Sequence, residues 1–595
     1  MHLKLLLVSD QVRGIDGTGG LGDVATGLAK ELARRPDIEV RLLMPGYQEA
    51  LNDAEQVIDN LQVPFGPEIR ALRVLKRNQP RFSAQEPNVP CYLLQDREIF
   101  RQRENSGRQA TLLGRAVVAF VEHFSDFHPD VIHCNDWHTG LIPVLLNTVF
   151  QRHPSLGRIA TVYTTHNNTG EAYQGAHAFS EVQPFAGLPD ECFRAMHGRS
   201  LEHHGRVNFA KGGLSYADLV NTVSLSYADE LRTPAFGGGL EAIVHERASD
   251  LCGIVNGIDV HEWNPHNDFY LPEDVRFTSH DPIDVVMDHK HWAREALRKW
   301  SDPKTGARPF ANVVNQSALL ATVTRITNQK AAIMLPTRED TGLPHETTSP
   351  LERLCRDVEG IQIVVLGSAE RGDSLGAHYV SWLEHLQRQF PAKLFFFNGF
   401  NIALSHLIYA ASEMFLVPSA FEPCGLTQLT SMRYGSVPIV RDVGGLRDTV
   451  IDETEGFLAN GFKFYELDRA SQGRHRMADV PRAAELMYQT VLRALQCRNN
   501  RERWAQIVEN GMSRDSSWSE PAAQYRKLYD EAVSRRVQTT FFTEPWSPRD
   551  LRREIDAVSH RWDQLLSIPL STYWNLRKLA TGRFGPFELT ENFYA

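Results

Sequence analysis

A chain of 595 residues is too long for a single hydrophobic core, so we expect two or more domains. Hydrophobic residues make up 42% of the chain and charged residues 23%, which is the composition of an ordinary globular protein. The net charge of -10 argues against a general nucleic-acid-binding protein. No apolar run approaches the roughly 18 residues that a membrane-spanning helix needs, so we expect no membrane segment.

The seven cysteines are scattered along the chain and form no CxxC pair. This pattern argues against a disulfide framework and against a zinc cluster, and it favours a reducing cytoplasm. The opening residues, MHLKLLLVSDQV, contain an apolar run too short for a secretory signal, with polar residues where a cleavage site should follow. We therefore interpret this run as the first strand of a fold.

The predicted elements begin with a strand at 3–8, a glycine-rich loop, GTGGLGDV, at 17–24, and an amphipathic helix at 24–32. Strand, glycine loop and helix in this order are typical of a turn that faces a phosphate. The glycine spacing does not fit the dinucleotide fingerprint, so a nicotinamide enzyme is not favoured.

A polar cluster follows the predicted strand at 131–133, after a helix expected at 117–124. Its members are His133, Asp136, Trp137 and His138. Side chains at the carboxyl end of a parallel strand are placed where α/β sheets bind ligands. A metal site is one interpretation of such a cluster, but no second matching group of His, Cys or Asp lies nearby in the sequence. A second strand, at 161–165, leads into His166.

The second half of the chain begins with a strand expected at 318–324, followed by RITNQKA with Arg325 and Lys330. Two cations at this spacing can lie on a solvated face, but Arg and Lys together suit a diphosphate, because one is a planar fork and the other a point charge. We favour the diphosphate. Residues 332–350 are expected to be an inserted polar loop, and another strand is expected at 361–366.

The stretch at 415–448 carries the strongest signal in the chain. A buried strand at 415–417 precedes Glu422, and a helix that opens near Gly425 is closed by Gly435. A carboxylate therefore lies beside the free N–H groups of a helix start, which form an anion cradle. After a strand at 437–440, Gly444-Gly445 is expected to let the backbone approach a ligand closely.

Several of these motifs together resemble the family of bacterial glycogen synthases and plant starch synthases, which are retaining glucosyltransferases of the GT-B fold. The word FEPCGLTQ at 421–428 is similar to the donor-site signature of that family, and the glycine loop, HNNTGEAYQG and RITNQKA match further family motifs. NFAKGGLSYADLVNTVS at 208–224 and GIVNGIDVHEWNP at 253–265 also match, in the same order. The resemblance covers roughly residues 1–530.

The resemblance implies an α/β protein of two Rossmann-like, doubly wound domains that face a cleft. The implied domains are an acceptor-side domain at 1–258, a nucleotide-sugar domain at 259–505, and helices at 506–540 that return toward the first domain. Residues 541–595 lie beyond the usual end of the family and are rich in aromatic residues. We expect this tail to pack on the protein or in an oligomer interface, and glucan binding by ring stacking is the alternative.

By the same resemblance, the activity is transfer of glucose from ADP-glucose, or another nucleotide-glucose, to the non-reducing end of an α-1,4-glucan with retention. No cofactor and no metal is implied, because cations and a helix dipole take the place of a metal. The implied catalytic residues are His166, Glu422, Arg325 and Lys330. The implied donor-binding residues are Gly19, Gly20, Asn256, Cys424, Gly425, Leu426 and Thr427, and the implied acceptor-binding residues are Asp136, Trp137 and His138.

Two positions depart from the family pattern: Gly17 stands where the family has a lysine, and Phe400-Asn401 stand where it has Tyr-Asp. Losing one charge-assisted contact to a ligand costs on the order of 1.5 to 3 kcal/mol, although a neighbour such as Arg13 is a substitute cation. Two alternatives follow. One is a GT-B transferase with a different donor or acceptor. The other is a catalytically weak glucan-binding or regulatory protein.

Overall fold

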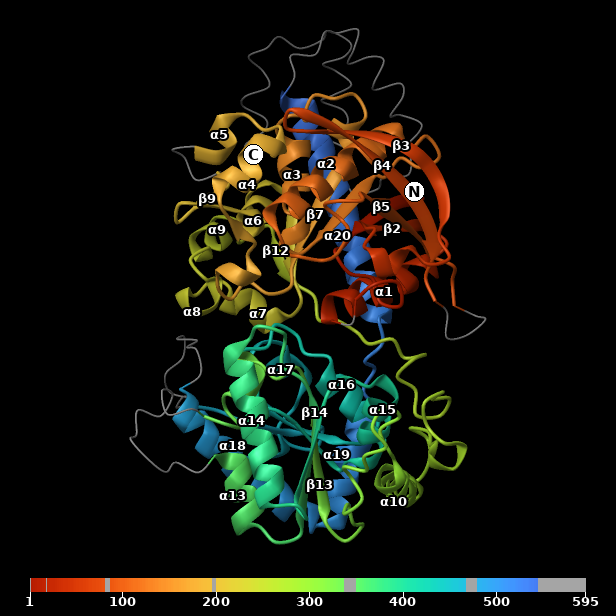
Figure 1. Ribbon diagram of the computed structural model, residues 1–595, viewed down its shortest axis with the longest axis vertical. Helices are drawn as coiled ribbons and strands as arrows, with labels where there is room; N and C mark the ends of the chain where they lie inside the picture. The colour runs from red at the N-terminus through yellow and green to blue at the C-terminus, as the bar shows by residue number, and fades with distance from the viewer. Residues whose placement is uncertain are drawn as a thin grey trace.

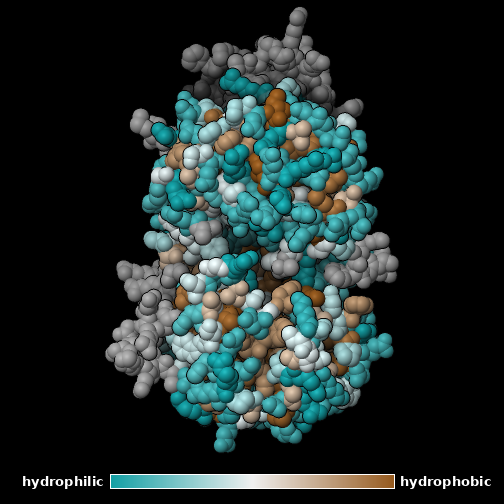
Figure 2. All heavy atoms as spheres, viewed as in Figure 1, coloured by the Kyte–Doolittle hydropathy of each residue, from teal (hydrophilic) through white to brown (hydrophobic). Residues whose placement is uncertain are grey.

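The computed structural model describes residues 2–17, 19–80, 86–194, 200–336, 349–466 and 479–543. Two α/β halves lie one above the other along the longest axis of the molecule (Figure 1). In the space-filling view the surface is hollowed between these halves (Figure 2). Among the described residues no helix is both long and apolar enough to cross a membrane.

The first half is built on a nine-stranded sheet in the order β12-β11-β7-β6-β1-β2-β5-β4-β3. Its strands pair in parallel from β12 to β5, and β4 and β3 add an antiparallel hairpin at one edge. The strands are β1 (Leu3–Val8), β2 (Ile38–Pro45), β3 (Glu55–Phe65), β4 (Glu68–Asn78), β5 (Pro90–Gln95), β6 (Val131–Asn135), β7 (Ala160–Thr165), β11 (Leu219–Thr222) and β12 (Leu251–Gly253). A separate three-stranded sheet contains β8 (Ala176–His177), β10 (Arg206–Asn208) and β9 (Glu202–His203).

The central strand β1 shows why this sheet is covered on both faces. Leu6 and Val8 pack in one apolar cluster with α2 and α3, while Leu5 and Leu7 pack in another with α1 and α20. A strand that buries both faces is a continuous apolar run, which is the pattern of LKLLLV. The helices of this half are α1 (Gly20–Ala33), α2 (Gly107–His123), α3 (Leu141–Asn147), α4 (Phe179–Ala186), α5 (Asp190–Arg194), α6 (Phe209–Tyr216), α7 (Leu225–Glu230), α8 (Pro234–Gly237) and α9 (Glu241–Glu246).

The second half is built on a six-stranded parallel sheet in the order β15-β14-β13-β16-β17-β18. Its strands are β13 (Ala318–Val323), β14 (Ile361–Gly367), β15 (Leu394–Asn398), β16 (Met414–Val417), β17 (Val437–Arg441) and β18 (Phe462–Phe464). Its helices are α10 (Ile283–Lys299), α11 (Asn328–Ala331), α13 (Pro350–Asp357), α14 (Ser374–Gln389), α15 (Ile402–Ala411), α16 (Thr427–Arg433), α17 (Gly444–Thr449), α18 (Val480–Arg498) and α19 (Arg501–Ser513). Apolar clusters cover both faces, one with α13, α14 and α18 and the other with α10 and α15.

The chain crosses between the halves twice, and the two crossings touch. The backbone N–H of Ile258 donates to the carbonyl of Ser516 at 2.8 Å. A Cβ on Gly257 would lie 2.5 Å from the carbonyl oxygen of Ser517, so only glycine allows this approach. After the second crossing, α20 (Ser519–Thr543) runs back along the first half and packs on α1 and β7. In Figure 1 this helix is the long blue ribbon behind the first sheet.

The expected architecture of two Rossmann-like domains is confirmed. Helix α1 begins earlier than expected, at Gly20, and α2 is longer because Ser106 caps it with a hydrogen bond from the N–H of Gln109. Of the polar loop expected at 332–350, residues 337–348 lie outside the described residues, as do residues 544–595 of the aromatic-rich tail. The expected domain limits at 258 and 505 stay predictions.

Candidate active site

The loop between β16 and α16 brings Glu422 to Lys330. The two side chains form an ion pair, and the Oγ of Ser419 donates to Glu422 Oε2 at 2.8 Å. Glu422 is only 7% exposed. Gln329, beside Lys330, fixes the loop by donating from Nε2 to the carbonyl of Phe421 at 2.8 Å. A buried carboxylate and a cation from different elements are thus held together after two neighbouring strands, β13 and β16.

Arg325 is not part of this pair. Its guanidinium Nη1 lies 2.8 Å from Glu370 Oε1, and its side chain is 55% exposed. The structure therefore joins Lys330 to Glu422 and leaves Arg325 in a solvated pair on the same side of the sheet. An exposed pair of this kind contributes little to stability, so Arg325 can exchange Glu370 for a more highly charged ligand.

The entry to α16 keeps backbone donors open. Gly425 has φ +75, and the amide of Gln428 donates to the carbonyls of Cys424 at 3.2 Å and Gly425 at 2.9 Å. Leu426 caps the helix and Thr427 is its first residue. In the described part of the chain no group accepts the backbone N–H of Gly425 or Leu426. These two N–H groups can therefore donate to an anionic oxygen of a ligand.

Asn256, at the start of the first crossing, lies against this loop. Burial raises the pKa of the Cys424 thiol to about 12, and a hydrogen bond from the backbone N–H of Asn256 opposes that rise. The Asn256 side chain is buried, and its Oδ1 has no partner among the described residues. A buried, unpaired amide oxygen is unusual in a protein, and it marks a position where a ligand donor fits.

Gly444 and Gly445 lie against the chain's own backbone, and their expected approach to a ligand stays a prediction. A Cβ on Gly444 would lie 2.0 Å from the carbonyl oxygen of Glu422, and one on Gly445 would lie 2.3 Å from that of Cys424. The N–H of Gly445 donates to the Glu422 carbonyl at 3.1 Å. The two glycines therefore let α17 pack on the loop of this chain that carries Glu422.

His166 follows β7 in the first half. Its Nε2 lies 3.0 Å from Asn135 Oδ1, and the Asn135 amide group donates to the carbonyls of Val8 and His133. Because Asn135 presents its oxygen, the His166 Nε2 carries the hydrogen and Nδ1 is the acceptor. Burial and the neighbouring His138 lower the pKa of His166 to about 3, so the imidazole is neutral at pH 7.

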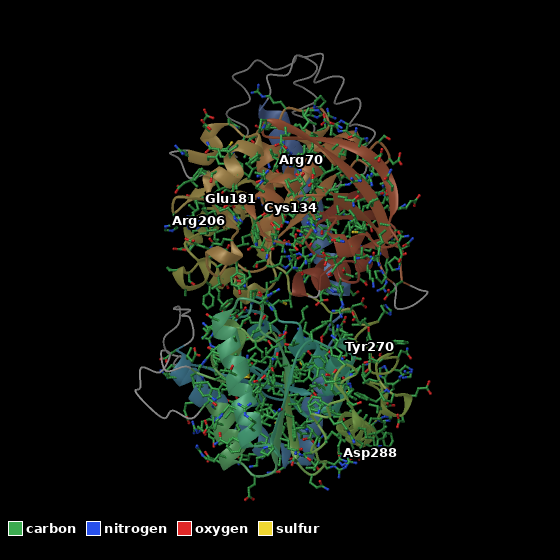
Figure 3. The ribbon with its side chains drawn as sticks, in the orientation of Figure 1. Arg70, Cys134, Glu181, Arg206, Tyr270 and Asp288 are labelled. Carbon is green, nitrogen blue, oxygen red and sulfur yellow. The ribbon has the colours of Figure 1, made fainter. Side chains whose placement is uncertain are left out.

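Asp136 follows β6, one residue beyond Asn135 and two beyond Cys134, which marks this strand in Figure 3. Its φ of +61 turns the chain into the short 3-10 helix η2 (Trp137–Thr139). Burial raises its pKa to about 7, against the lowering effect of the backbone N–H groups of Trp137 and His166. Its Oδ1 has no partner among the described residues, so a ligand hydroxyl can donate to it.

Trp137 and His138 stack on each other, with ring centroids 3.8 Å apart. The Trp137 side chain is 5% exposed, and its ring packs so closely on Gly175 that a Cβ there would lie 2.1 Å away. His138 Nε2 lies 3.3 Å from Asn105 Oδ1. The indole face is therefore covered by the protein, whereas Asp136 Oδ1 and His138 Nδ1 both lack a partner among the described residues.

Gly19 caps α1 and Gly20 is its first residue, in the loop where Gly17 replaces a lysine of the family pattern. Gly17 has φ +128, and a Cβ there would lie 2.8 Å from the Cβ of Gln11. Arg13, the expected substitute cation, pairs with Asp23 and Glu262. Its charge is therefore committed to the protein.

Asn135, which contacts His166, is a residue of this candidate site that the sequence interpretation did not single out. It stands between His133 and Asp136, and an amide at the carboxyl end of a parallel strand was the available signal. The described residues contain no group of three or more His, Cys, Asp or Glu side chains suited to a metal ion.

Comparisons with known proteins place this geometry in a family. A family model for the starch synthase catalytic domain matches residues 4–246, and one for glycosyl transferases group 1 matches residues 328–467. The chain is 34% identical to a glycogen synthase of Desulforudis audaxviator (strain MP104C) over 548 residues, which is 90% of this chain and 97% of that protein. The chain belongs to the glycogen and starch synthase family. It is a glucosyltransferase.

Other members of the glycogen and starch synthase family agree. Glycogen synthase 2 of Geobacter sulfurreducens (strain ATCC 51573 / DSM 12127 / PCA) is 34% identical over 90% of this chain and all of its own length. The catalytic domain of starch synthase IV from Arabidopsis thaliana, solved bound to ADP and acarbose, has a TM-score of 0.73 and 28% identity. It covers 90% of this chain and is itself covered completely. A sucrose-phosphate synthase from Thermosynechococcus elongatus, with a TM-score of 0.51 and 18% identity over 89% of this chain and 99% of its own, shares the fold.

Proposed function

We propose that this member of the glycogen and starch synthase family transfers glucose from ADP-glucose to the non-reducing 4-hydroxyl of an α-1,4-glucan, with retention at the anomeric carbon. The observation that carries the proposal is the Lys330–Glu422 pair beside the open N–H groups of Gly425 and Leu426. A leaving diphosphate develops negative charge, and preorganised donors stabilise such charge most effectively.

The donor side is assigned as follows. Lys330 and the N–H groups at Gly425, Leu426 and Thr427 meet the diphosphate, and Arg325 joins them by leaving Glu370. Glu422 accepts hydrogen bonds from sugar hydroxyls, and Asn256 Oδ1 accepts another from the donor. Cys424 holds the loop in position against Asn256. Gly19 and Gly20 let the first half approach the donor from across the hollow.

The acceptor side is assigned to the loop after β6. Asp136 accepts hydrogen bonds from glucan hydroxyls, while Trp137 and His138 shape the loop that holds it. His166 orients the donor ring as a neutral imidazole, and Asn135 sets which ring nitrogen carries its hydrogen. The sugars that this arrangement takes are uncharged, which agrees with a pocket where burial opposes charge on His166 and Asp136.

A cytoplasmic location is proposed from the state of the cysteines. All seven cysteines are free, which agrees with a reducing compartment. Association into an oligomer is compatible with the proposal and is tested by the mass of the protein in solution. Nucleic acid and membrane are not proposed as partners.

Incorporation of labelled glucose into glycogen tests the proposal. ADP-glucose and UDP-glucose are supplied separately to the protein and to its Glu422→Ala variant. The matched control is Glu485→Gln, a carboxylate on α18 that pairs with Arg353. We expect incorporation from ADP-glucose that requires Glu422 and not Glu485. Incorporation from neither donor would contradict the proposal.

A different donor is the second candidate, and the glycine loop favours it. Gly17 supplies no cation, and Arg13 is occupied by Asp23 and Glu262. Faster incorporation from UDP-glucose than from ADP-glucose selects this candidate. Glucan binding without incorporation from either donor selects instead the weakly catalytic homologue.

A further inference from the structure

Helix α7 lies where the two halves of the molecule meet, at the end of the stretch that matches the family as NTVS. In Figure 1 it lies at the lower edge of the first half, above α17 of the second, with which it is in contact. The strand before it, β11, is bound to the strand that carries His166, since Thr222 Oγ1 donates to the carbonyl of Thr165 at 2.8 Å. The contacts of α7 reach both sides of the proposed active site.

In the second half, α7 forms hydrogen bonds with the loop that carries Glu422 and with helix α17. The Oγ of Ser224, which caps α7, donates to the carbonyl of Pro423, next to Glu422. The N–H and Oγ of Ser226 donate to the carboxylate of Asp448 on α17, the N–H at 2.9 Å. The fully buried Glu230 accepts the N–H of Gly444 at 3.0 Å.

Gly444 and Gly445, the first two residues of α17, connect these contacts to the loop that carries Glu422. The N–H of Gly444 points to Glu230 of the first half, and the next N–H, that of Gly445, points to the carbonyls of Glu422 and Pro423. A Cβ at Gly444 would lie 2.0 Å from the carbonyl oxygen of Glu422, so the absence of a side chain lets α17 pack directly on the backbone of this loop. Glu230 is therefore linked to the Glu422 loop through two consecutive backbone N–H groups, those of Gly444 and Gly445.

On the first half, the same helix holds the loop of His166. The hydroxyl of Tyr227 accepts the backbone N–H of Asn168 at 2.9 Å. Asn168 in turn donates from Nδ2 to the carbonyl of Gly237 at 2.9 Å, and its carbonyl accepts from Gln174. Tyr227, Asn168 and Glu230 are all fully buried, so these hydrogen bonds do not compete with water.

We infer that α7 is the positioning element of this glucosyltransferase: Tyr227 on one side and Glu230 with Ser226 on the other hold the His166 loop and the Glu422 loop at one fixed separation. Neither Tyr227 nor Glu230 touches substrate in this assignment. The inference deepens the proposed function and rests on it for its catalytic meaning. The mechanical link itself is independent of which sugar is transferred.

Amide hydrogen exchange of the full chain, with and without ADP, tests the link on each side of the helix. In Glu230→Ala, which removes the acceptor for Gly444, we expect faster exchange at 444–446 and also at 166–169, in the other half. In Tyr227→Phe we expect the effect to run in the opposite direction: faster exchange at 166–169, which Tyr227 contacts, and also at 444–446 in the other half. Asp229→Ala is the matched control, because Asp229 lies on the same helix, is 67% exposed and pairs with Arg232.

The proposal is overturned if each substitution speeds exchange only in the loop that it contacts, or in neither loop. Glu230→Gln keeps an oxygen that accepts the Gly444 N–H, so it should restore slow exchange in both loops. Where Glu230→Ala lowers the yield of folded protein, Ser226→Ala is the milder variant, because it removes one hydrogen bond to Asp448 and leaves the buried carboxylate in place.

Kinetics provides the second measurement. If α7 sets the separation of the two loops, Glu230→Ala and Tyr227→Phe should each lower kcat by roughly tenfold to a hundredfold and change KM for glucan little, with Glu230→Gln close to the unaltered protein. A loss of kcat that Glu230→Gln does not rescue counts against the positioning role. If the unaltered protein incorporates no glucose while the exchange results hold, the proposed function fails and the link stands.

Discussion

At the scale of single residues, the chemistry of this protein depends on partly buried charges that need each other. Lys330 and Glu422 form a pair with little exposure, and Ser419 donates to the same carboxylate. Removing one partner of such a pair leaves the other without compensation, which costs more than the pair contributes. The same rule explains why Arg13, bound between Asp23 and Glu262, cannot serve a ligand without disrupting the protein.

Lys330→Ala should therefore lower kcat/KM for the nucleotide-sugar by roughly tenfold to more than a hundredfold, because a charge-assisted contact of about 1.5 to 3 kcal/mol is lost. Steady-state kinetics with ADP-glucose measures the effect. Lys304→Ala, at an exposed lysine before β13, is the control and should keep full activity. Equal activity of both variants would contradict the role assigned to Lys330.

Gly17→Lys should destabilise the protein and bring no gain in rate, although it restores the family's residue. The backbone there has φ +128, and a Cβ meets the side chain of Gln11 at 2.8 Å. A side chain in such a conformation costs on the order of 1 to 3 kcal/mol. Urea unfolding measures the loss, and Gly20→Ala is the control for stability, because nothing lies within 4 Å of a Cβ at Gly20. A faster and equally stable Gly17→Lys variant would show that this loop relaxes.

At the scale of elements, α20 acts as part of the first half although it comes last in the described chain. Its Tyr529 hydroxyl donates to His133 Nδ1 at 2.9 Å, and the other ring nitrogen of His133 donates to Thr164 at 2.6 Å. Thr164 donates to Asn221, which donates to Tyr525. Burial lowers the pKa of His133 to about 3, so the ring is neutral and has one donor and one acceptor nitrogen. This network ties α20 to the strands that carry Asn135 and His166.

Tyr529→Phe should thus reduce the free energy of unfolding by about 1 to 3 kcal/mol, since it leaves a buried ring nitrogen without a partner. Thermal or urea unfolding measures this change in the free energy of unfolding. Tyr465→Phe is the control, because that hydroxyl bonds Glu455 at an exposed position and its loss should cost much less. Similar losses in the two variants would mean that the buried network contributes nothing beyond a surface contact.

At the scale of the whole molecule, the two halves meet through a buried carboxylate. Burial raises the pKa of Glu230 to about 7; the Gly444 N–H, Arg447 and Arg441 oppose that rise and Asp448 adds to it. When the halves part, Glu230 meets water and its pKa falls toward the ordinary value of about 4.3. Between these two values the joined arrangement keeps a proton that the parted one releases.

The joined arrangement should consequently be favoured most below about pH 4.3 and lose that preference as the pH rises to about 7. The measurement is exchange at 444–446 from pH 5 to pH 8, expressed as the ratio between the protein and Glu230→Gln at each pH so that intrinsic exchange cancels. The ratio should rise with pH up to about 7 and then level off. A ratio independent of pH would show that Glu230 keeps one protonation state throughout.

The family motifs were sufficient to predict the two-domain fold, the positions of β1, β7, β13 and β16, and the functional family. Local patterns suffice there because a buried strand is a continuous apolar run and a glycine closes a helix wherever it occurs. The sequence did not predict which groups each of these site residues contacts. Lys330 reaches Glu422 while its neighbour in the motif, Arg325, pairs with Glu370, and both outcomes depend on loops far away in the sequence.

By itself, then, the sequence determined which elements form and which side chains stand at strand ends, because both depend on residues close along the chain. The tertiary structure alone decided that Trp137 is covered by Gly175 and His138, that Gly444-Gly445 faces the chain's own loop, and that α7 spans the two loops of the site. These outcomes depend on close packing between segments that meet only when the chain folds. The residue pattern within one segment does not indicate which other segment will pack against it.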